Sequence, residues 1–202
     1  MQHLKYCVAL IAAVSVLSLT APDGVCGERD HENGFFLRLA LGGGPAKSRI
    51  ESGPEFLEFS GTGLDIEIAV GGIVAPNLAV HGTVFGWLIS DPDLKSDYGS
   101  VQAKGDLNLS ALGAGLTYYF MPINIYLSGT VGFGQLSGDG DIDGSTDTGL
   151  ILEAVAGKEW FVSNRWGLGV AVGFTYHSLP EPDIDPNWKG WSIPIRFSAT
   201  FN

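Results

Sequence analysis

The sequence predicts an all-β protein: a transmembrane eight-stranded antiparallel up-and-down β-barrel. Three observations lead to this prediction. Apolar and polar residues alternate along the chain, short and long connections alternate between the alternating segments, and charge is scarce. Of the 202 residues, 16% are charged and 45% are hydrophobic, and 29 are glycine. A soluble domain has about a quarter charged residues, whereas strands between lipid and a narrow lumen need fewer.

The alternation is clearest along residues 166–178. Even positions there are large and apolar, from Trp166 to Tyr176, and odd positions are glycine, alanine, threonine or histidine. Successive strand residues point to opposite faces, so the segment has one apolar face and one face of small or polar residues. No stretch after residue 28 shows the 3.6-residue periodicity of an amphipathic helix.

Eight such segments are expected as strands. They lie near 34–45, 59–73, 78–90, 105–120, 124–136, 147–161, 166–178 and 188–202. Each is long enough to cross a membrane as a tilted strand, which takes about 9–11 residues. In the fourth segment the leucines change parity between Leu109 and Leu112, which predicts a β-bulge near Ser110–Ala111.

The connections between these segments alternate in length. The tight ones are 74–77, 121–124 and 162–165, and the long ones, expected as loops, are 46–58, 91–104, 137–146 and 179–187. Outer-membrane barrels have short turns on the periplasmic side and longer loops outside. Both chain ends are therefore predicted in the periplasm, and the long loops outside the cell.

Residues 1–27 are predicted to be a signal peptide, which leaves residues 28–202 as the barrel domain. Lys5 supplies the positive start, and the uncharged apolar run of residues 6–19 is too short to span a bilayer as a helix. Cleavage after Gly27 fits the small residues at positions −3 and −1.

The two cysteines do not support a disulfide. Cys7 lies in the signal peptide, so at most one cysteine remains in the mature chain. Cys26 permits a lipoprotein interpretation, which Asp23 weakens because an aliphatic residue is expected there. The cleavage site and the fate of Cys26 stay open.

The apolar face of each strand is predicted to meet lipid. The other face is mostly glycine, alanine, serine and threonine, whereas a water-exposed exterior would carry many lysines and glutamates. Aromatic residues near both ends of the strands predict two interfacial belts. The predicted belt residues are Trp87, Tyr118, Tyr119, Phe120, Trp160, Phe161, Trp166, Tyr176, Trp188 and Trp191. The alternative is a soluble lipocalin-like binding barrel, with its apolar residues inside.

Five charged residues fall on the inward face: Arg38, Asp65, Glu67, Glu153 and Arg196. The first, second and eighth segments become neighbours when the barrel closes, so the arginines can pair with the acids. A buried charge without a partner is costly, and eight strands leave just enough interior for side chains. A filled lumen with a paired charge network, and no open pore, is therefore predicted.

The signal peptide, the four hairpins and the closing segment 191–202 resemble the small outer-membrane β-barrel families. These include the barrel domain of outer membrane protein A, outer membrane protein X, and the "outer membrane protein beta-barrel domain" group. The resemblance covers the mature chain and is architectural. It implies a Gram-negative outer-membrane location among lipid and lipopolysaccharide. It also implies recognition by the barrel assembly machinery through a terminal aromatic residue, here the penultimate Phe201.

The predicted function is a structural or surface-interaction role, adhesion-like, for a monomer without cofactor or enzyme activity. A net charge of −11 argues against nucleic acid as a partner. The alternative function is a lipid A-modifying enzyme, with His81, Thr83, His177 and Ser178 as candidate residues. The last two are adjacent in a strand and point to opposite faces, and no Gly-x-Ser-x-Gly motif is present.

Residues 139–144 match the start of a calcium-binding loop, with Asp139, Asp141 and Asp143 at the ligand positions. The twelfth position is Leu150 instead of the glutamate that completes such a site. A solvated acidic loop without metal is predicted, and weak calcium binding is the alternative.

Overall fold

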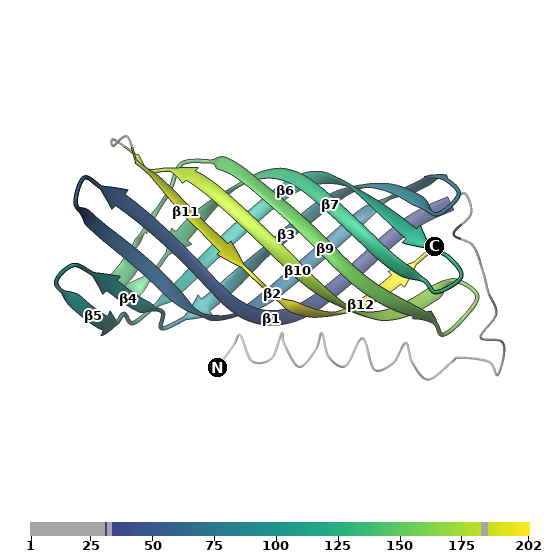
Figure 1. The fold of residues 1–202 in the computed structure, drawn as a ribbon, viewed down its shortest axis with the longest axis horizontal. Helices are drawn as coiled ribbons and strands as arrows, with labels where there is room; N and C mark the ends of the chain where they lie inside the picture. The colour runs from purple at the N-terminus through teal and green to yellow at the C-terminus, as the bar shows by residue number, and fades with distance from the viewer. Residues whose placement is uncertain (1–30, 32–33, 183–185) are drawn as a thin grey trace.

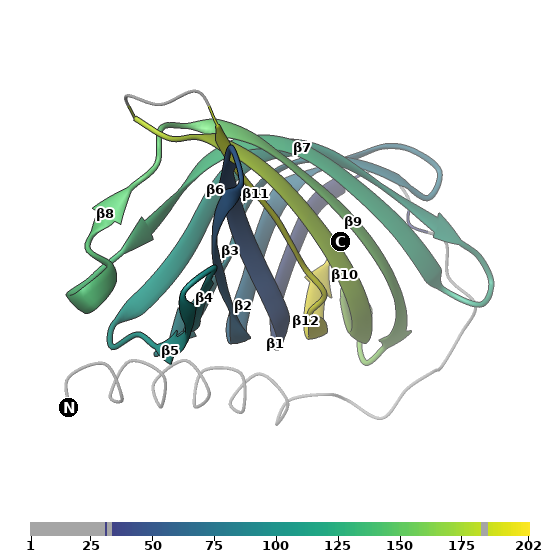
Figure 2. The same cartoon turned by 60° about the vertical axis from the view of Figure 1, so that its left-hand side comes forward.

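A single antiparallel sheet makes up the protein and closes on itself as a barrel (Figures 1 and 2). The computed structural model describes residues 31, 34–182 and 186–202, so the predicted signal peptide lies outside the described residues. The strands are β1 (Gly34–Ser52), β2 (Glu55–Ala75), β3 (Leu78–Ser90), β4 (Asp93–Ser96), β5 (Gly99–Gln102), β6 (Asp106–Phe120), β7 (Ile125–Gly138), β8 (Gly144–Ser145), β9 (Gly149–Phe161), β10 (Trp166–Pro180), β11 (Asn187–Ser192) and β12 (Ile195–Phe201).

Eight strand positions, counted around the barrel, form its ring, and each is called a stave. Seven are β1, β2, β3, β6, β7, β9 and β10, and the eighth is β12 followed, further along the same side of β1, by β11. The eighth stave is interrupted at Ile193 and Pro194, since proline has no N–H to give to a ladder. The predicted eight-stranded antiparallel barrel is therefore confirmed.

The two ends of the barrel differ, as Figure 1 shows. At the end that we call the turn end, tight turns join β2 to β3, β6 to β7 and β9 to β10, and the barrel begins at Gly34 and closes at Phe201. Asn77 and Asn124 in two of these turns have positive φ angles of 63° and 50°, which asparagine tolerates better than most residues. We call the opposite end the loop end.

The prediction of a long loop at 46–58 is wrong. β1 and β2 stay paired from Gly34–Ile73 to Ser52–Glu55, around a two-residue turn in which Gly53 has a φ of 63°. Glycine adopts this conformation without steric cost, so the hairpin closes tightly. With 19 and 21 residues, the two strands are about twice as long as a membrane crossing requires.

Two other predicted loops contain short elements of their own. The 91–104 connection forms the hairpin of β4 and β5. β4 extends the sheet by pairing with residues 57–60 of β2, at the loop end. The 137–146 connection contains the short 3₁₀ helix η2 (Gly140–Ile142) and β8, which pairs with β7. The loop end is therefore built mainly from strand hairpins.

The predicted bulge near Ser110–Ala111 is also wrong. β6 pairs with β3 and β7 in unbroken register. Leu107 and Leu109 point into the barrel, and Leu112 points outward. Leu107 and Leu109 fill an apolar layer inside the barrel, whereas Leu112 lies on the apolar outer face. The leucines therefore change parity without an extra residue in the strand.

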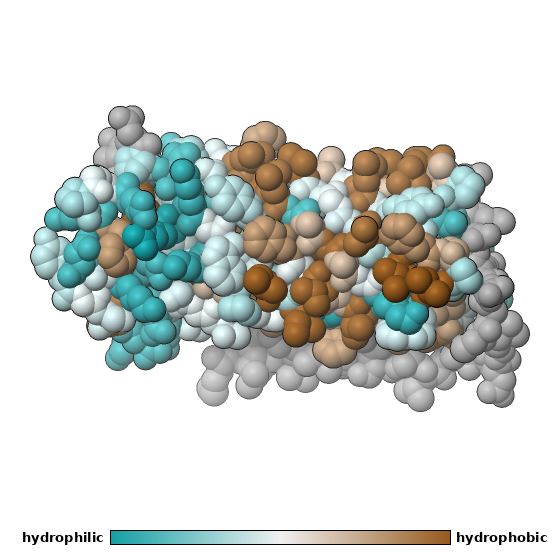
Figure 3. Space-filling view, viewed as in Figure 1, coloured by the Kyte–Doolittle hydropathy of each residue, from teal (hydrophilic) through white to brown (hydrophobic). Residues whose placement is uncertain are grey.

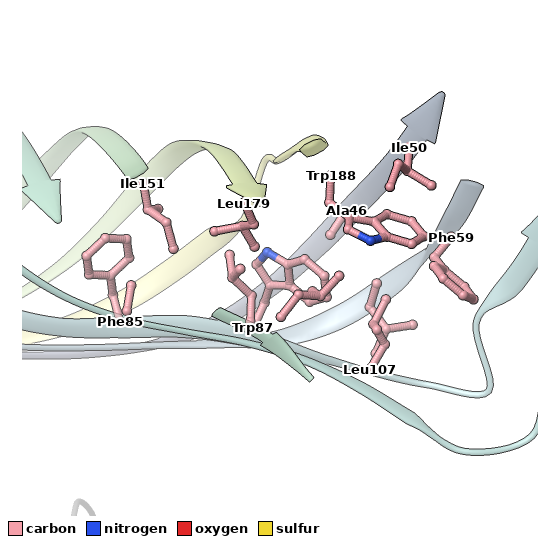
Figure 4. Close-up of a cluster of buried hydrophobic side chains, with 13 residues drawn as sticks. Ala46, Ile50, Phe59, Phe85, Trp87, Leu107, Ile151, Leu179 and Trp188 are labelled. Atoms are coloured by element: carbon pink, nitrogen blue, oxygen red, sulfur yellow. The ribbon is translucent and has the colours of Figure 1, made fainter. Parts of the chain in front are cut away.

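Three layers fill the interior from the loop end to the turn end. The first is an apolar cluster in the loop-end half, shown in Figure 4. Its members are Ala46, Ile50, Phe59, Phe85, Trp87, Ile89, Leu107, Leu109, Ala111, Leu136, Ile151, Leu179 and Trp188. The third is a smaller apolar cluster near the turn end, around Phe36, Ile73 and Tyr119. The second, between them, is charged: along β9, Ile151 of the first cluster is followed by Glu153, then by Val155 of the third.

The outer face of the staves is apolar over most of its height. Side chains such as Leu127 (52% exposed), Val172 (51%) and Phe197 (70%) point away from the interior. In Figure 3 the hydrophobic residues gather over the middle and the turn-end part of the barrel, and the loop end is hydrophilic. Soluble proteins rarely expose contiguous apolar surface on this scale, so lipid is the environment that fits it. Among the described residues, no helix is both long and apolar enough to cross a membrane.

Candidate functional site

A charge network crosses the middle of the barrel interior, and Arg196 of β12 lies at its centre. Its Nη1 donates to Glu67 Oε2 over 2.6 Å, and its Nη2 donates to Glu153 Oε1 over 2.6 Å. Its Nε and Nη2 both bond to Asp65, the latter over 3.1 Å. The three acids come from β2 and β9, so one fully buried guanidinium ties three staves together.

Arg38 of β1 forms the second half of this network. Its Nε donates to Glu67 Oε1 over 2.9 Å, and its Nη2 donates to Ser128 Oγ of β7 over 3.1 Å. The guanidinium also lies 4.8 Å from the centre of the Tyr126 ring, a distance at which a cation is attracted to an aromatic face. Glu67 thus bridges both arginines, and the structure joins all five predicted inward charges.

Glu159 is a further inward carboxylate that the sequence analysis missed. It is 2% exposed, and Thr200 Oγ1 donates to its Oε1 over 2.7 Å. The sequence pattern could have identified it, because Glu159 shares the parity of Glu153 in the same strand and therefore also points inward. The described interior therefore contains two guanidinium groups and four carboxylates. Side chains that reach across the lumen, as Arg38 of β1 does to Ser128 of β7, tie separate staves together.

His81 belongs to this polar layer. Its Nδ1 lies 2.7 Å from Thr83 Oγ1, and its Nε2 lies 2.9 Å from Thr117 Oγ1. Both ring nitrogens are therefore occupied by hydroxyl groups, one from the same strand, β3, and one from the neighbouring β6, as expected of a structural histidine.

His177 pairs with a serine other than the neighbour considered from the sequence. Its Nε2 lies 2.9 Å from Ser48 Oγ, and both side chains are fully buried. Ser178 lies on the opposite face of β10, where its hydroxyl accepts a bond from Asn187. Among the described residues, His177 Nδ1 has no hydrogen-bond partner. A hydrolytic triad needs an acid at that nitrogen and access for substrate, and this pair has neither.

The predicted aromatic belts need a correction. Trp87, Tyr119 and Trp188 are at most 8% exposed and point into the barrel, and Phe161 has the inward parity of its strand. Consecutive strand residues cannot share a face, so Tyr119 cannot join its neighbours in one belt. Trp87 and Trp188 belong instead to the apolar filling at the loop end (Figure 4). The remaining belt residues, on the outer face, are Tyr118, Phe120, Trp160, Trp166, Tyr176 and Trp191.

Phe201, the predicted assembly signal, ends β12 on the outer face at the turn end. Its ring centre lies 5.3 Å from that of Trp166 and 6.2 Å from that of Phe35. The last residue, Asn202, continues beyond it and donates its N–H to the Arg165 carbonyl over 3.0 Å.

The carboxylates of the acidic loop, residues 139–144, accept hydrogen bonds from backbone N–H groups. Asp139 Oδ1 accepts the N–H of Asp106 over 2.6 Å, and Asp141 Oδ2 accepts that of Lys104 over 3.1 Å. Nowhere in the described part of the chain do three or more histidine, cysteine, aspartate or glutamate side chains lie together as metal ligands would. These acids therefore fasten η2 to the start of β6.

Comparison with known proteins identifies the fold. No protein-family model matches the sequence, and no curated protein is significantly similar to it. The crystal structure of Neisserial surface protein A (NspA) matches with a TM-score of 0.57 at 18% identity, over 83% of this chain and 96% of that chain. The chain has the fold of a small outer-membrane β-barrel protein.

Two further solved structures match more loosely. Ail, the attachment invasion locus protein of Yersinia pestis, has a TM-score of 0.46 at 13% identity, over 81% of this chain and 97% of that one. The outer membrane protein OprG from Pseudomonas aeruginosa has a TM-score of 0.42 at 16% identity, over 85% of this chain and 98% of that one. Both TM-scores are below 0.5, so these two structures add no argument; the likeness to NspA, at 18% identity, shows the fold and no particular activity.

Proposed function

We propose that this chain is a monomeric, non-enzymatic protein of the bacterial outer membrane with a structural or surface-interaction role. The proposed orientation has both chain ends and the tight turns in the periplasm, and the loop end outside the cell. One observation carries the proposal: the interior is filled throughout the membrane part, so the loop end is the surface left for contacts.

The loop end is suited to such contacts because it projects well beyond the apolar band. The β1–β2 hairpin carries mostly polar and charged residues on its outer face near its tip, among them Lys47, Arg49 and Glu51. The β4–β5 hairpin exposes Tyr98 (88%) and Val101 (62%), and exposed aromatic side chains are common anchors in protein interfaces.

The proposal is tested by locating the mature protein and probing its orientation. We expect it to fractionate with outer membranes, to resist extraction with urea, and to migrate differently on gels with and without heating. Protease added to intact cells is expected to cut within the loop-end connections and to spare the turns. A protein recovered from the periplasm, monodisperse without detergent, would contradict the proposal and favour the lipocalin-like alternative.

The alternative of a lipid A-modifying enzyme rests on the histidines. Alanine at His81 and His177 is expected to leave the mass spectrum of cellular lipid A unchanged, since both side chains are enclosed in the barrel. A lipid A species that disappears in either variant would favour the enzyme.

A further inference from the structure

Basic residues form a row across the outer face at the loop end. In the registers of β11, β1, β2 and β4, Lys189 lies opposite Arg49, Arg49 opposite Glu58, and Glu58 opposite Lys95. Directly paired residues share a face, and the inward positions beside them are filled by residues such as Trp188. These four residues, Lys189, Arg49, Glu58 and Lys95, are called the basic row below.

The basic row has three cations and one carboxylate, and the carboxylate is already used. Glu58, only 8% exposed at its side chain, accepts from Lys47 over 2.6 Å and from Arg49 over 3.5 Å. Arg49 also pairs with Glu51 over 2.8 Å, but that side chain is 65% exposed, so water screens the pair. No salt bridge among the described residues involves Lys189 or Lys95.

Arg49 and Lys189 face each other directly across the β1–β11 pair. Like charges in this arrangement repel and destabilise the sheet. Arg49 shares Glu58 with Lys47 and has a second, exposed partner in Glu51. Lys189 and Lys95 have no acidic partner among the described residues, so cations outnumber carboxylates here, and an external anion would balance this excess.

The surface between these side chains is hollowed. A hollow of about 510 Å³ opens on the outer face, and its lining includes three cations, Lys47, Arg49 and Lys189, together with Glu51 and Trp191. Trp191 is one of the outward aromatic residues at the border of the apolar band. The cations therefore lie just beyond that border, at the level where lipid headgroups begin.

An apolar hollow lies further along the same outer face, within the apolar band. It measures about 430 Å³ and includes Ala154, Ala156, Phe174 and Ile193 in its lining. The two outward alanines of β9 leave the depression between larger neighbours. Trp191 lines the first hollow and Ile193, two residues further along the chain, lines the second, so the two hollows are neighbours along the eighth stave.

We infer that the two neighbouring hollows together bind a phosphorylated, multiply acylated glycolipid of the outer leaflet. A phosphate group sits between Arg49 and Lys189, and an acyl chain passes Trp191 and Ile193 into the apolar hollow. The inference rests on the proposed function, because it requires the loop end to face the outer leaflet. The apolar continuation distinguishes this ligand from free phosphate, which needs no acyl groove.

The test measures lipid binding to the full mature chain, folded in neutral detergent, by native mass spectrometry. The probe is hexa-acylated, bisphosphorylated lipid A, and the variant carries Arg49→Gln with Lys189→Gln. We expect about a tenfold loss of affinity, since losing two charge-assisted contacts costs at least about 1.4 kcal/mol. Dephosphorylated lipid A should bind the unaltered protein as weakly as lipid A binds the variant, and added salt should weaken only phosphate-dependent binding.

Two controls make the result specific. Lys104→Gln removes an exposed loop-end lysine outside the basic row and should leave binding unchanged. Ala154→Phe fills the apolar hollow and should weaken lipid A without affecting inorganic phosphate.

Equal affinity for lipid A in the double variant and the unaltered protein would overturn the inference. So would full competition by millimolar inorganic phosphate, which would indicate a plain anion site. A failure to fractionate with outer membranes would contradict the proposed function but would not alter this measurement in detergent.

Discussion

Replacing Arg196 with methionine removes the centre of the interior charge network while keeping an unbranched side chain. The variant leaves Asp65, Glu67 and Glu153 without the guanidinium that all three share. Glu67 keeps its bond to Arg38, but no other salt bridge is found for Asp65 or Glu153 in the described part of the chain. The main cost is therefore two buried carboxylates with no cation.

Removing one partner of a buried ion pair typically costs about 3–5 kcal/mol, and Arg196 belongs to several pairs. We expect the upper part of this range. Adding Glu153→Gln to Arg196→Met removes one of the two stranded charges, so the double variant should be more stable than Arg196→Met alone. For comparison, Glu51→Gln breaks an exposed pair with Arg49 and should cost less than about 1 kcal/mol.

The assay is equilibrium urea unfolding in phosphatidylcholine vesicles, followed by tryptophan emission and by the shift in gel migration on heating. A loss below about 1 kcal/mol for Arg196→Met would refute the reasoning. So would a double variant whose destabilisation equals the sum of the two single ones, because coupled partners in one network are expected to be non-additive.

Three further predictions concern packing, orientation and assembly. Gly157→Ala would place a Cβ 2.6 Å from the inward ring of Tyr126 and should lower the free energy of unfolding in vesicles by about 1–3 kcal/mol. In the control Gly129→Ala the new Cβ meets nothing within 4 Å, so the free energy of unfolding should change by no more than about 0.5 kcal/mol. In vesicles of brominated phospholipid, a protein with Trp160 as its one tryptophan should lose most of its emission, and one with Trp87 should keep it; equal quenching would contradict the assigned faces. Phe201→Ala should lower the rate of assembly into outer membranes, measured by the appearance of the heat-modifiable form. The stability of the folded barrel should change by no more than about 1 kcal/mol. An unchanged rate would contradict the assembly role of Phe201.

The period-two pattern determines how much of this fold the sequence can predict. It identifies all eight staves and five of the six inward charges found in the described interior, Glu159 being missed, because a strand that separates two environments must alternate. It does not reveal what fills the interior at each height. Leu107 and Leu109 therefore predicted a bulge, although they only face an apolar layer inside the barrel.

Proline obscured the length of the first hairpin. Pro45 and Pro54 are typical of loops, yet Pro45 lies within β1, where its carbonyl accepts the N–H of Ile193 over 3.0 Å. This contact falls where β11 gives way to β12, a place where the ladder is already interrupted. Pairing of that kind depends on residues far apart in the sequence, as does the basic row, whose members come from four different strands.

The central claim is that the apolar outer face of the staves meets acyl chains while charges fill the interior. Spin labels at successive positions 168–174 of β10, in vesicles, test it through their collisions with oxygen and with a water-soluble nickel complex. The account predicts high oxygen and low nickel accessibility at Leu168, Val170, Val172 and Phe174, with both reagents excluded at the positions between. Frequent nickel collisions at the four outward positions would show that water surrounds the barrel and would contradict the account.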